Sequence, residues 1–316
     1  MSGSGRLPSD SRVLRMWHSR GNAMQPIEPN TPPNSVIWRV VHFPLTLLVI
    51  AVALIIAGSM ASHLVLPSNR PGDFSGWAQV AVSAANAGII VLAYWILVRF
   101  VERRREVADF ATRGWLAELG GGFGAGIVLF SLVFGIILAL GGYRIVGTNS
   151  PSVLVLPLAT SLLTGLVEET LFRGIFFRLM ERLFGSWIAL ALSGALFGAA
   201  HLANPNATLF AGIAIALEAG IMLAALYMLT RRLWAAIGLH AAWNFAQGAL
   251  YGIPVSGFQQ VGLLKPSVSG STLLTGGAFG AEASLTAVIV DTLFGVALLV
   301  LAYRRGNFVA PMWARR

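Results

Sequence analysis

The sequence of 316 residues contains no cysteine and very little charge. Without cysteine, neither a disulfide framework nor a thiolate metal site can form. Only 11% of the residues are charged and 56% are hydrophobic, whereas soluble domains carry about 25% charged residues. A soluble protein of this size could not keep so much apolar surface away from water. The composition therefore indicates an integral membrane protein.

Long apolar segments recur along the chain, each near the length of about 20 residues that crosses a bilayer. They lie at 37–58, 77–98, 121–141, 153–177, 186–203, 207–229, 233–250 and 283–302. The sequence therefore predicts an all-α fold, a polytopic transmembrane helical bundle with about eight spans.

The basic residues are distributed unevenly between the two sides of these spans. Seventeen arginines fall on one side, and only Arg70, Arg144 and Lys265 fall on the other. Because cytoplasmic loops are enriched in Lys and Arg, both termini are predicted to be cytoplasmic. The net charge of +9 thus reflects topology, and we expect membrane lipid rather than nucleic acid as a partner. The arginine-dominated loops and short connections favour a bacterial inner (plasma) membrane.

The spans and their flanking segments divide the chain into six parts. We expect a disordered cytoplasmic tail at 1–35, N-terminal transmembrane helices at 36–145, a helical core at 146–250, an external loop at 251–281, a last transmembrane helix at 282–303 and a cytoplasmic tail at 304–316. The loop at 251–281 is long enough to cover the core from outside.

Several spans carry polar side chains, each of which costs about 2.5–3.5 kcal/mol or more in hydrocarbon. The fourth, fifth and seventh spans contain Glu168, Glu169, Arg173, Phe197, His201, His240 and Asn244. At about 1.5 Å per residue from the arginine-rich side, Glu168, His201, His240 and Asn244 lie about 15, 21, 12 and 18 Å deep. Three helices thus bring polar groups to a similar level, which favours a site over unrelated structural hydrogen bonds.

Helical spacing suggests separate roles for the two glutamates. Glu169 and Arg173 are i,i+4 neighbours and can neutralise each other. Glu168 lies about 100° further round the helix and has no such local partner. It is therefore the candidate general base.

Three further acids in or near the spans are harder to interpret. Glu218 and Asp291 stand alone in the sixth and eighth spans, where they could line a cavity or pair with polar neighbours. Glu282 is predicted in the first turn of the eighth helix, where a negative charge meets the favourable helix dipole.

The polar set resembles the CPBP (Abi) family of intramembrane proteases, which includes the type II CAAX prenyl endopeptidases. The resemblance rests on Glu168-Glu169-x-x-x-Arg173, Phe197-x-x-x-His201 and His240-x-x-x-Asn244, in this order on separate helices. It covers residues 150–250. It implies cleavage of membrane-associated peptides or proteins in a chamber open to the cytoplasmic side.

The resemblance also implies a role for each residue. Glu168, helped by His201, would deprotonate the attacking water, while His240 and Asn244 would donate hydrogen bonds to the oxyanion. Glu169 and Arg173 would hold the helix that carries Glu168.

A zinc-dependent version of this chemistry stays open. Glu168, His201 and His240 are a two-histidine, one-carboxylate set of the kind that binds catalytic zinc. The chain contains no H-E-x-x-H pair, and the preferred mechanism uses no metal.

Other functions make different demands on the sequence. The chain has neither the G-x-S-G motif of rhomboid proteases nor the G-x-G-D motif of presenilins. A non-enzymatic scaffold or immunity protein would not need the carboxylate of Glu168. An ion transporter would use Glu168, Glu218 and Asp291 as ion sites.

Overall fold

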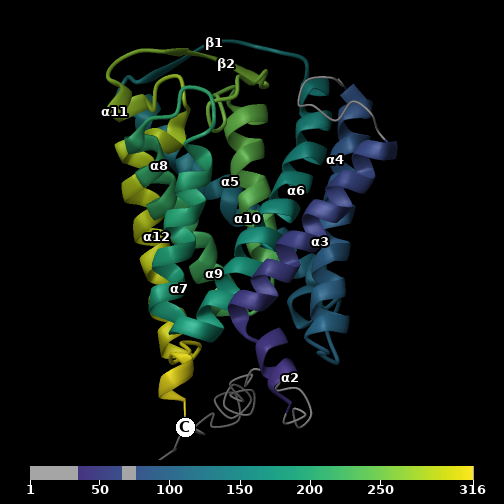
Figure 1. Cartoon of the computed structure of the whole chain (residues 1–316). Helices are drawn as coiled ribbons and strands as arrows, with labels where there is room; N and C mark the ends of the chain where they lie inside the picture. The colour runs from purple at the N-terminus through teal and green to yellow at the C-terminus, as the bar shows by residue number, and fades with distance from the viewer. Residues whose placement is uncertain (1–34, 66–75, 316) are drawn as a thin grey trace, which may run out of the picture.

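The computed structural model describes residues 35–65 and 76–315. They form a bundle of long helices that run along one common direction, with the C-terminus and α2 at the same end (Figure 1). This is the arrangement that an even number of passes produces. The predicted tail at 1–35, apart from Ser35, and Arg70 lie outside the described residues.

The first part of the chain supplies four helices and two short helical turns. They are α2 (Val36–Val41), α3 (Pro44–Val65), α4 (Gly76–Ile96), the π-helix η1 (Leu97–Val101), the 3-10 turn η2 (Ala108–Phe110) and α5 (Trp115–Ala139).

The remaining helices contain three more π-helical segments. They are η3 (Pro151–Leu154), α6 (Val155–Glu169), the π-helix η4 (Thr170–Phe177), α7 (Arg178–His201), α8 (Leu209–Ile215), the π-helix η5 (Ala216–Ile221), α9 (Met222–Thr230), α10 (Trp234–Asn244), the π-helix η6 (Phe245–Leu250), α11 (Thr272–Thr275), η7 (Ala281–Ala283), α12 (Leu285–Arg304) and η8 (Met312–Ala314).

The prediction of an all-α polytopic membrane bundle is confirmed. In the described ranges, six helical runs are long and apolar enough to cross a membrane. One of them, Pro151–His201, is 51 residues long and changes direction at Gly185, whose φ is 78° and ψ 170°. The run Trp234–Leu250, made of α10 and η6, was also predicted to span. The count of eight spans stays a prediction.

The first predicted span, 37–58, is displaced along the chain. The spanning helix α3 begins at Pro44, after the separate short helix α2, which ends with His42 as its C-cap. Proline has no N–H to donate and disfavours helical geometry at the residue before it. The apolar residues before Pro44 therefore cannot continue into α3 as one helix.

Two short strands depart from the all-α pattern, and the second of them lies in the predicted external loop. β1 (Tyr143–Thr148) pairs antiparallel with β2 (Leu264–Val268) across the end of the bundle opposite the C-terminus (Figure 1). The hydroxyl of Tyr143 also donates to the carbonyl of Thr275 at 2.6 Å. Because the paired strands are far apart in sequence, no local pattern could reveal this ribbon.

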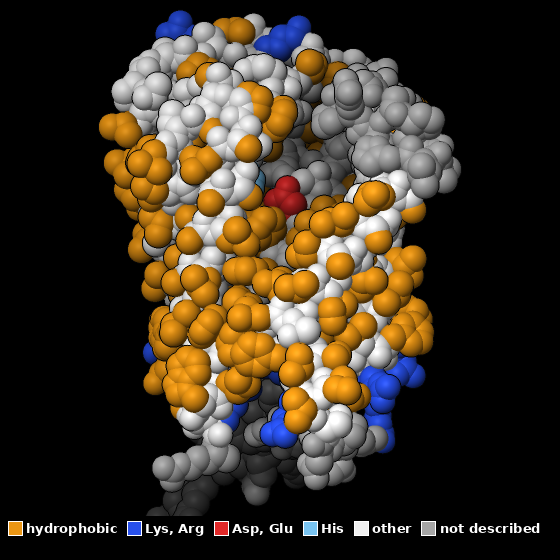
Figure 2. All heavy atoms as spheres, in the orientation of Figure 1, with side chains coloured by type: hydrophobic (Ala, Val, Ile, Leu, Met, Phe, Trp, Pro, Cys, Tyr) orange, Lys and Arg blue, Asp and Glu red, His pale blue; other side chains and the backbone are white. Residues whose placement is uncertain are grey.

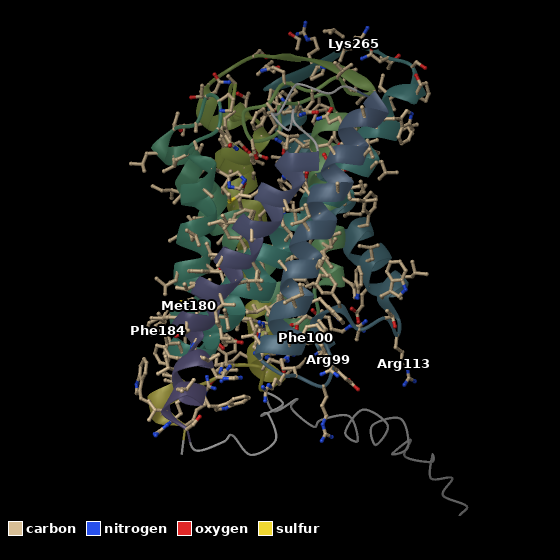
Figure 3. All side chains as sticks on the ribbon, turned by 45° about the vertical axis from the view of Figure 1, so that its right-hand side comes forward. Arg99, Phe100, Arg113, Met180, Phe184 and Lys265 are labelled. Atoms are coloured by element: carbon tan, nitrogen blue, oxygen red, sulfur yellow. The ribbon has the colours of Figure 1, made fainter. Side chains whose placement is uncertain are left out.

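The charged residues mark the two ends of the bundle. Arg99 and Arg113 lie at one end and Lys265 at the other (Figure 3). At the arginine-rich end, Asp109 accepts hydrogen bonds from the hydroxyls of Tyr94 and Tyr227 at 2.6 and 2.7 Å. Burial alone would raise the pKa of Asp109, but nearby arginines and these hydroxyls hold it below its usual value.

Helices α5 and α10 approach each other so closely that only glycine fits between them. A Cβ on Gly122 would lie 2.1 Å from the carbonyl oxygen of Ala235, and one on Gly238 would lie 2.1 Å from that of Leu119. Small residues allow such contact between membrane helices, where close packing replaces the hydrophobic effect as the driving force. This contact fixes the position of α10.

We expect Gly122→Ala to destabilise the protein by about 1–3 kcal/mol, the usual cost of overpacking. Thermal unfolding in detergent measures the effect. Gly124→Ala on the same helix is the matched control, since nothing lies within 4 Å of a Cβ there. Equal melting temperatures for the two variants would contradict the tight α5–α10 contact.

Candidate active site

Glu169 and Arg173 form a completely buried ion pair at the junction of α6 and η4. The Nη1 atom of Arg173 lies 2.8 Å from Oε1 of Glu169, and both side chains are 0% exposed. The predicted i,i+4 pair is thereby confirmed. Glu168, the neighbouring residue, keeps 25% of its side chain exposed.

Arg173 also joins its own helix to two others. Its Nη2 atom donates to the carbonyls of Ala219 and Gly220 in η5, at 2.9 and 3.1 Å. Its guanidinium carbon lies 4.5 Å from the ring centroid of Phe197 on α7. These contacts lock the segment that carries Glu168 against η5 and α7.

His240 of α10 lies between the two glutamates. Its Nδ1 atom is 2.8 Å from Oε1 of Glu169, and its Nε2 atom is 3.8 Å from Oε2 of Glu168. Because a carboxylate only accepts, Nδ1–H donates to Glu169 and directs Nε2 towards Glu168. Glu169 therefore orients His240 as well as pairing with Arg173, a role that the sequence did not indicate.

His201 is oriented by its own helix. Its Nδ1 atom lies 2.8 Å from the carbonyl oxygen of Phe197, one turn earlier on α7. Nδ1–H therefore donates to the backbone, and Nε2 is left as the basic nitrogen. The buried ring of Phe197 lies 4.8 Å from the His201 ring and 6.1 Å from the His240 ring, centroid to centroid.

A small cavity brings these residues together with Asn244. It measures about 30 Å³, which leaves room for about two water molecules. Its polar lining includes His201, Glu218, His240, Asn244, Glu282 and Asp291. Glu168 is not part of this lining, but its Oε2 atom lies 3.8 Å from Nε2 of His240, which is.

The cavity lies in the half of the bundle away from the arginine-rich end. Ser256 and Glu282, which belong to the segment between η6 and α12, form part of its wall. Figure 2 shows a hollow in this half of an otherwise apolar face, with an acidic side chain and part of a histidine inside it. The expected opening of the chamber towards the cytoplasmic side stays a prediction.

The predicted zinc ligands do not converge. Within the described ranges, no three His, Cys, Asp or Glu side chains are placed to hold a metal ion. The Nδ1–H groups of His201 and His240 donate to the Phe197 carbonyl and to Glu169, which leaves both Nε2 atoms free. Because Glu168, His201 and His240 are not grouped as ligands, they do not form the open tetrahedral site of a catalytic zinc in this arrangement.

Three π-helical segments lie beside the polar residues of the site. η4 contains Arg173 and follows the two glutamates, η5 contains Glu218, and η6 directly follows Asn244. Such segments are rare, and they occur often at functional sites. In η5, the carbonyls of Ala219 and Gly220 accept hydrogen bonds from Arg173.

Sequence reasoning left Glu218, Glu282 and Asp291 outside the site, but the structure places all three on the cavity wall. Their position inside apolar segments was the available signal, since an intramembrane carboxylate marks a functional site by default. Glu282 lies in η7, just before α12, rather than in the first turn of that helix as predicted.

Comparison with known proteins agrees with the geometry. Residues 149–246 match the family model of the type II CAAX prenyl endopeptidase, Rce1-like. Neither the search of curated proteins nor that of solved structures finds a match. The matched segment contains Glu168, Glu169, Arg173, His201, His240 and Asn244. The chain thus carries, over residues 149–246, a domain of the Rce1-like type II CAAX prenyl endopeptidase family, which confirms the resemblance to the CPBP proteases.

Proposed function

We propose that this multi-pass membrane protein is an intramembrane endopeptidase that hydrolyses peptide bonds of membrane-associated peptides or proteins. The observation that carries the proposal is the pair of contacts made by His240, whose two nitrogens face Glu169 and Glu168 beside a cavity of water size. The family match supports the same class of reaction.

The attacking species is a water molecule in the cavity. Glu168, assisted by the basic Nε2 of His201, takes one proton from it while the oxygen attacks the carbonyl carbon of the scissile bond. The resulting tetrahedral intermediate carries a negative oxygen. Glu168 then returns the proton to the amide nitrogen, the C–N bond breaks, and an amine and a carboxylic acid are released.

His240 and Asn244 stabilise the negative oxygen of the intermediate. Two carboxylates flank His240, which favours the imidazolium form with a donor on both nitrogens. Nδ1 is held by Glu169, so Nε2–H and the amide of Asn244 are the groups that can donate to the oxyanion. These donors act on charge that exists only in the transition state, so they accelerate the reaction rather than tighten substrate binding.

Cleavage of a membrane-presented peptide by the purified protein tests the proposal. We expect Asn244→Ala to lower kcat about 100- to 1,000-fold with little change in KM, the usual effect of removing one oxyanion donor. Asn86→Ala is the matched control, because Asn86 lies on α4 and does not line the cavity. No cleavage by the wild type, or equal kcat in all three proteins, would overturn the assignment.

The same assay decides whether a metal takes part. We expect activity to survive prolonged treatment with a chelator, because within the described residues Glu168, His201 and His240 are not grouped as metal ligands. Loss of activity that added zinc restores would refute the metal-free mechanism and leave the protease assignment standing.

A further inference from the structure

The wall of the cavity carries three carboxyl groups that the proposed reaction does not use. Glu218 comes from η5, Glu282 from η7 and Asp291 from α12, and they are 2%, 4% and 1% exposed. They share this cavity with His201 and His240. Three separate elements of the fold thus direct acids to one small space.

Other deeply buried acids of the described residues have a cation beside them. Each is paired with an arginine at 2.5–3.1 Å; these pairs are Glu102 with Arg178, Asp109 with Arg104, Glu169 with Arg173 and Glu181 with Arg231. In the same part of the chain, Glu218, Glu282 and Asp291 form no ion pair with a basic side chain. The protein pairs its other buried acids with arginine, whereas these three share the cavity wall only with the imidazole groups of His201 and His240.

The oxygens of this acidic trio, Glu218, Glu282 and Asp291, are only partly satisfied. Oε2 of Glu218 and Oδ1 of Asp291 are buried without a hydrogen-bond partner. Glu282 accepts a hydrogen bond from the backbone N–H of Ser256. Three carboxylates cannot all stay ionised in so small an apolar space, so the free protein must hold protons on some of them. In agreement, burial raises the pKa of Glu282 to about 7.

The small volume and the acidic lining of the cavity limit which chemical group could replace these protons. A primary ammonium is about as large as one water molecule, has three N–H donors and carries the required charge. The cavity of about 30 Å³ has room for two such groups or waters, whereas a planar guanidinium is larger. The trio is not arranged to hold a metal ion. An anionic group, such as a peptide carboxylate, would be repelled.

We propose that Glu218, Glu282 and Asp291 form a subsite that binds a primary ammonium group of the substrate, either a lysine side chain or an α-amino group, next to the scissile bond. This inference rests on the proposed peptidase function and names the class of substrate. The apolar stem of a lysine lies against the apolar part of the cavity wall, which includes Ile215, Leu223 and Leu239, while its ammonium group reaches the acids. Binding of the cation displaces the protons that the empty subsite holds.

A set of membrane-presented peptides tests the subsite. The peptides are identical except for lysine, norleucine or glutamate at a position flanking the scissile bond, and the full-length protein in proteoliposomes cleaves each of them. We expect kcat/KM for the lysine peptide to exceed that for the norleucine peptide by about 10- to 100-fold, as for a charge-assisted hydrogen bond. The glutamate peptide should be the poorest substrate.

Variants of the acidic trio then test whether these acids cause the preference for lysine. Glu218→Gln and Asp291→Asn should bring the lysine-to-norleucine ratio of kcat/KM close to one, whereas Glu106→Gln, which removes an exposed acid far from the cavity, should leave the ratio unchanged. The comparison within the wild type needs no variant, so misfolding cannot obscure it. Equal cleavage of the two peptides at every flanking position, or an unchanged ratio in both variants, would overturn the subsite alone. Failure of the wild type to cleave any peptide would overturn the proposed function and the subsite with it.

Discussion

Replacing Glu168 by glutamine is expected to lower kcat for peptide cleavage by about 100- to 10,000-fold, the range for loss of a general base. Glutamine keeps the shape of the side chain but cannot take a proton from water. KM should stay near the wild-type value, because Glu168 acts on the reacting water and not on the substrate. Steady-state kinetics on a membrane-presented peptide give both constants.

The fold should tolerate this change. Glu168 is 25% exposed and its closest charged contact is Nε2 of His240 at 3.8 Å, so its neutralisation leaves no buried arginine without a partner. The melting temperature of Glu168→Gln should therefore match that of the control variant Glu106→Gln. A kcat within a few-fold of wild type in a folded Glu168→Gln protein would rule out Glu168 as the base.

Replacing Arg173 by methionine should destabilise the protein by about 3–5 kcal/mol, the usual cost of removing one partner of a buried ion pair. Arg173 is 0% exposed and holds Glu169, two carbonyls of η5 and the Phe197 ring. Without it, Glu169 keeps its hydrogen bond to His240 but loses its arginine. Equilibrium unfolding in mixed detergent measures the change.

A double variant separates two causes of the loss of stability, the uncompensated buried charge and the lost packing of Arg173. In Glu169→Gln/Arg173→Met the uncompensated carboxylate is absent, so part of the stability should return. Arg105→Met, which removes an exposed arginine, should lie within about 0.5 kcal/mol of wild type. If Arg173→Met unfolds at the same denaturant concentration as Arg105→Met, the ion pair does not stabilise the site.

Much of the membrane architecture could be predicted from the sequence, because the bilayer imposes a length and a polarity on each segment. Seven of the eight predicted spans lie close to observed helices, and the first is displaced by Pro44. The Glu169–Arg173 pair was also predictable, since helical spacing alone brings i and i+4 together. The π-helices were not, and in η5 the carbonyls of Ala219 and Gly220 accept hydrogen bonds from Arg173, a residue 46 and 47 positions away in the chain.

The contacts that define the site depend on partners far apart in the chain. His240 and Glu169 are 71 residues apart in the sequence. No local sequence pattern could predict which ring nitrogen of His240 faces which glutamate. The acidic trio likewise needs η5, η7 and α12 to meet before Glu218, Glu282 and Asp291 can share a cavity. From the sequence, Glu218 and Asp291 were isolated intramembrane acids and Glu282 was assigned to the start of a helix.

The sequence by itself determined a multi-pass helical bundle and the residues whose burial in lipid requires an explanation, because hydrophobic length and isolated polar groups are local properties. Only the tertiary structure decided how those groups are used. Close packing at Gly122 and Gly238 sets the position of α10. In this position of α10, His240 lies between Glu168 and Glu169. The fold also places the cavity away from the arginine-rich end, next to three acids without an arginine. These outcomes depend on which helices meet and how they are rotated, which is decided by packing between distant segments.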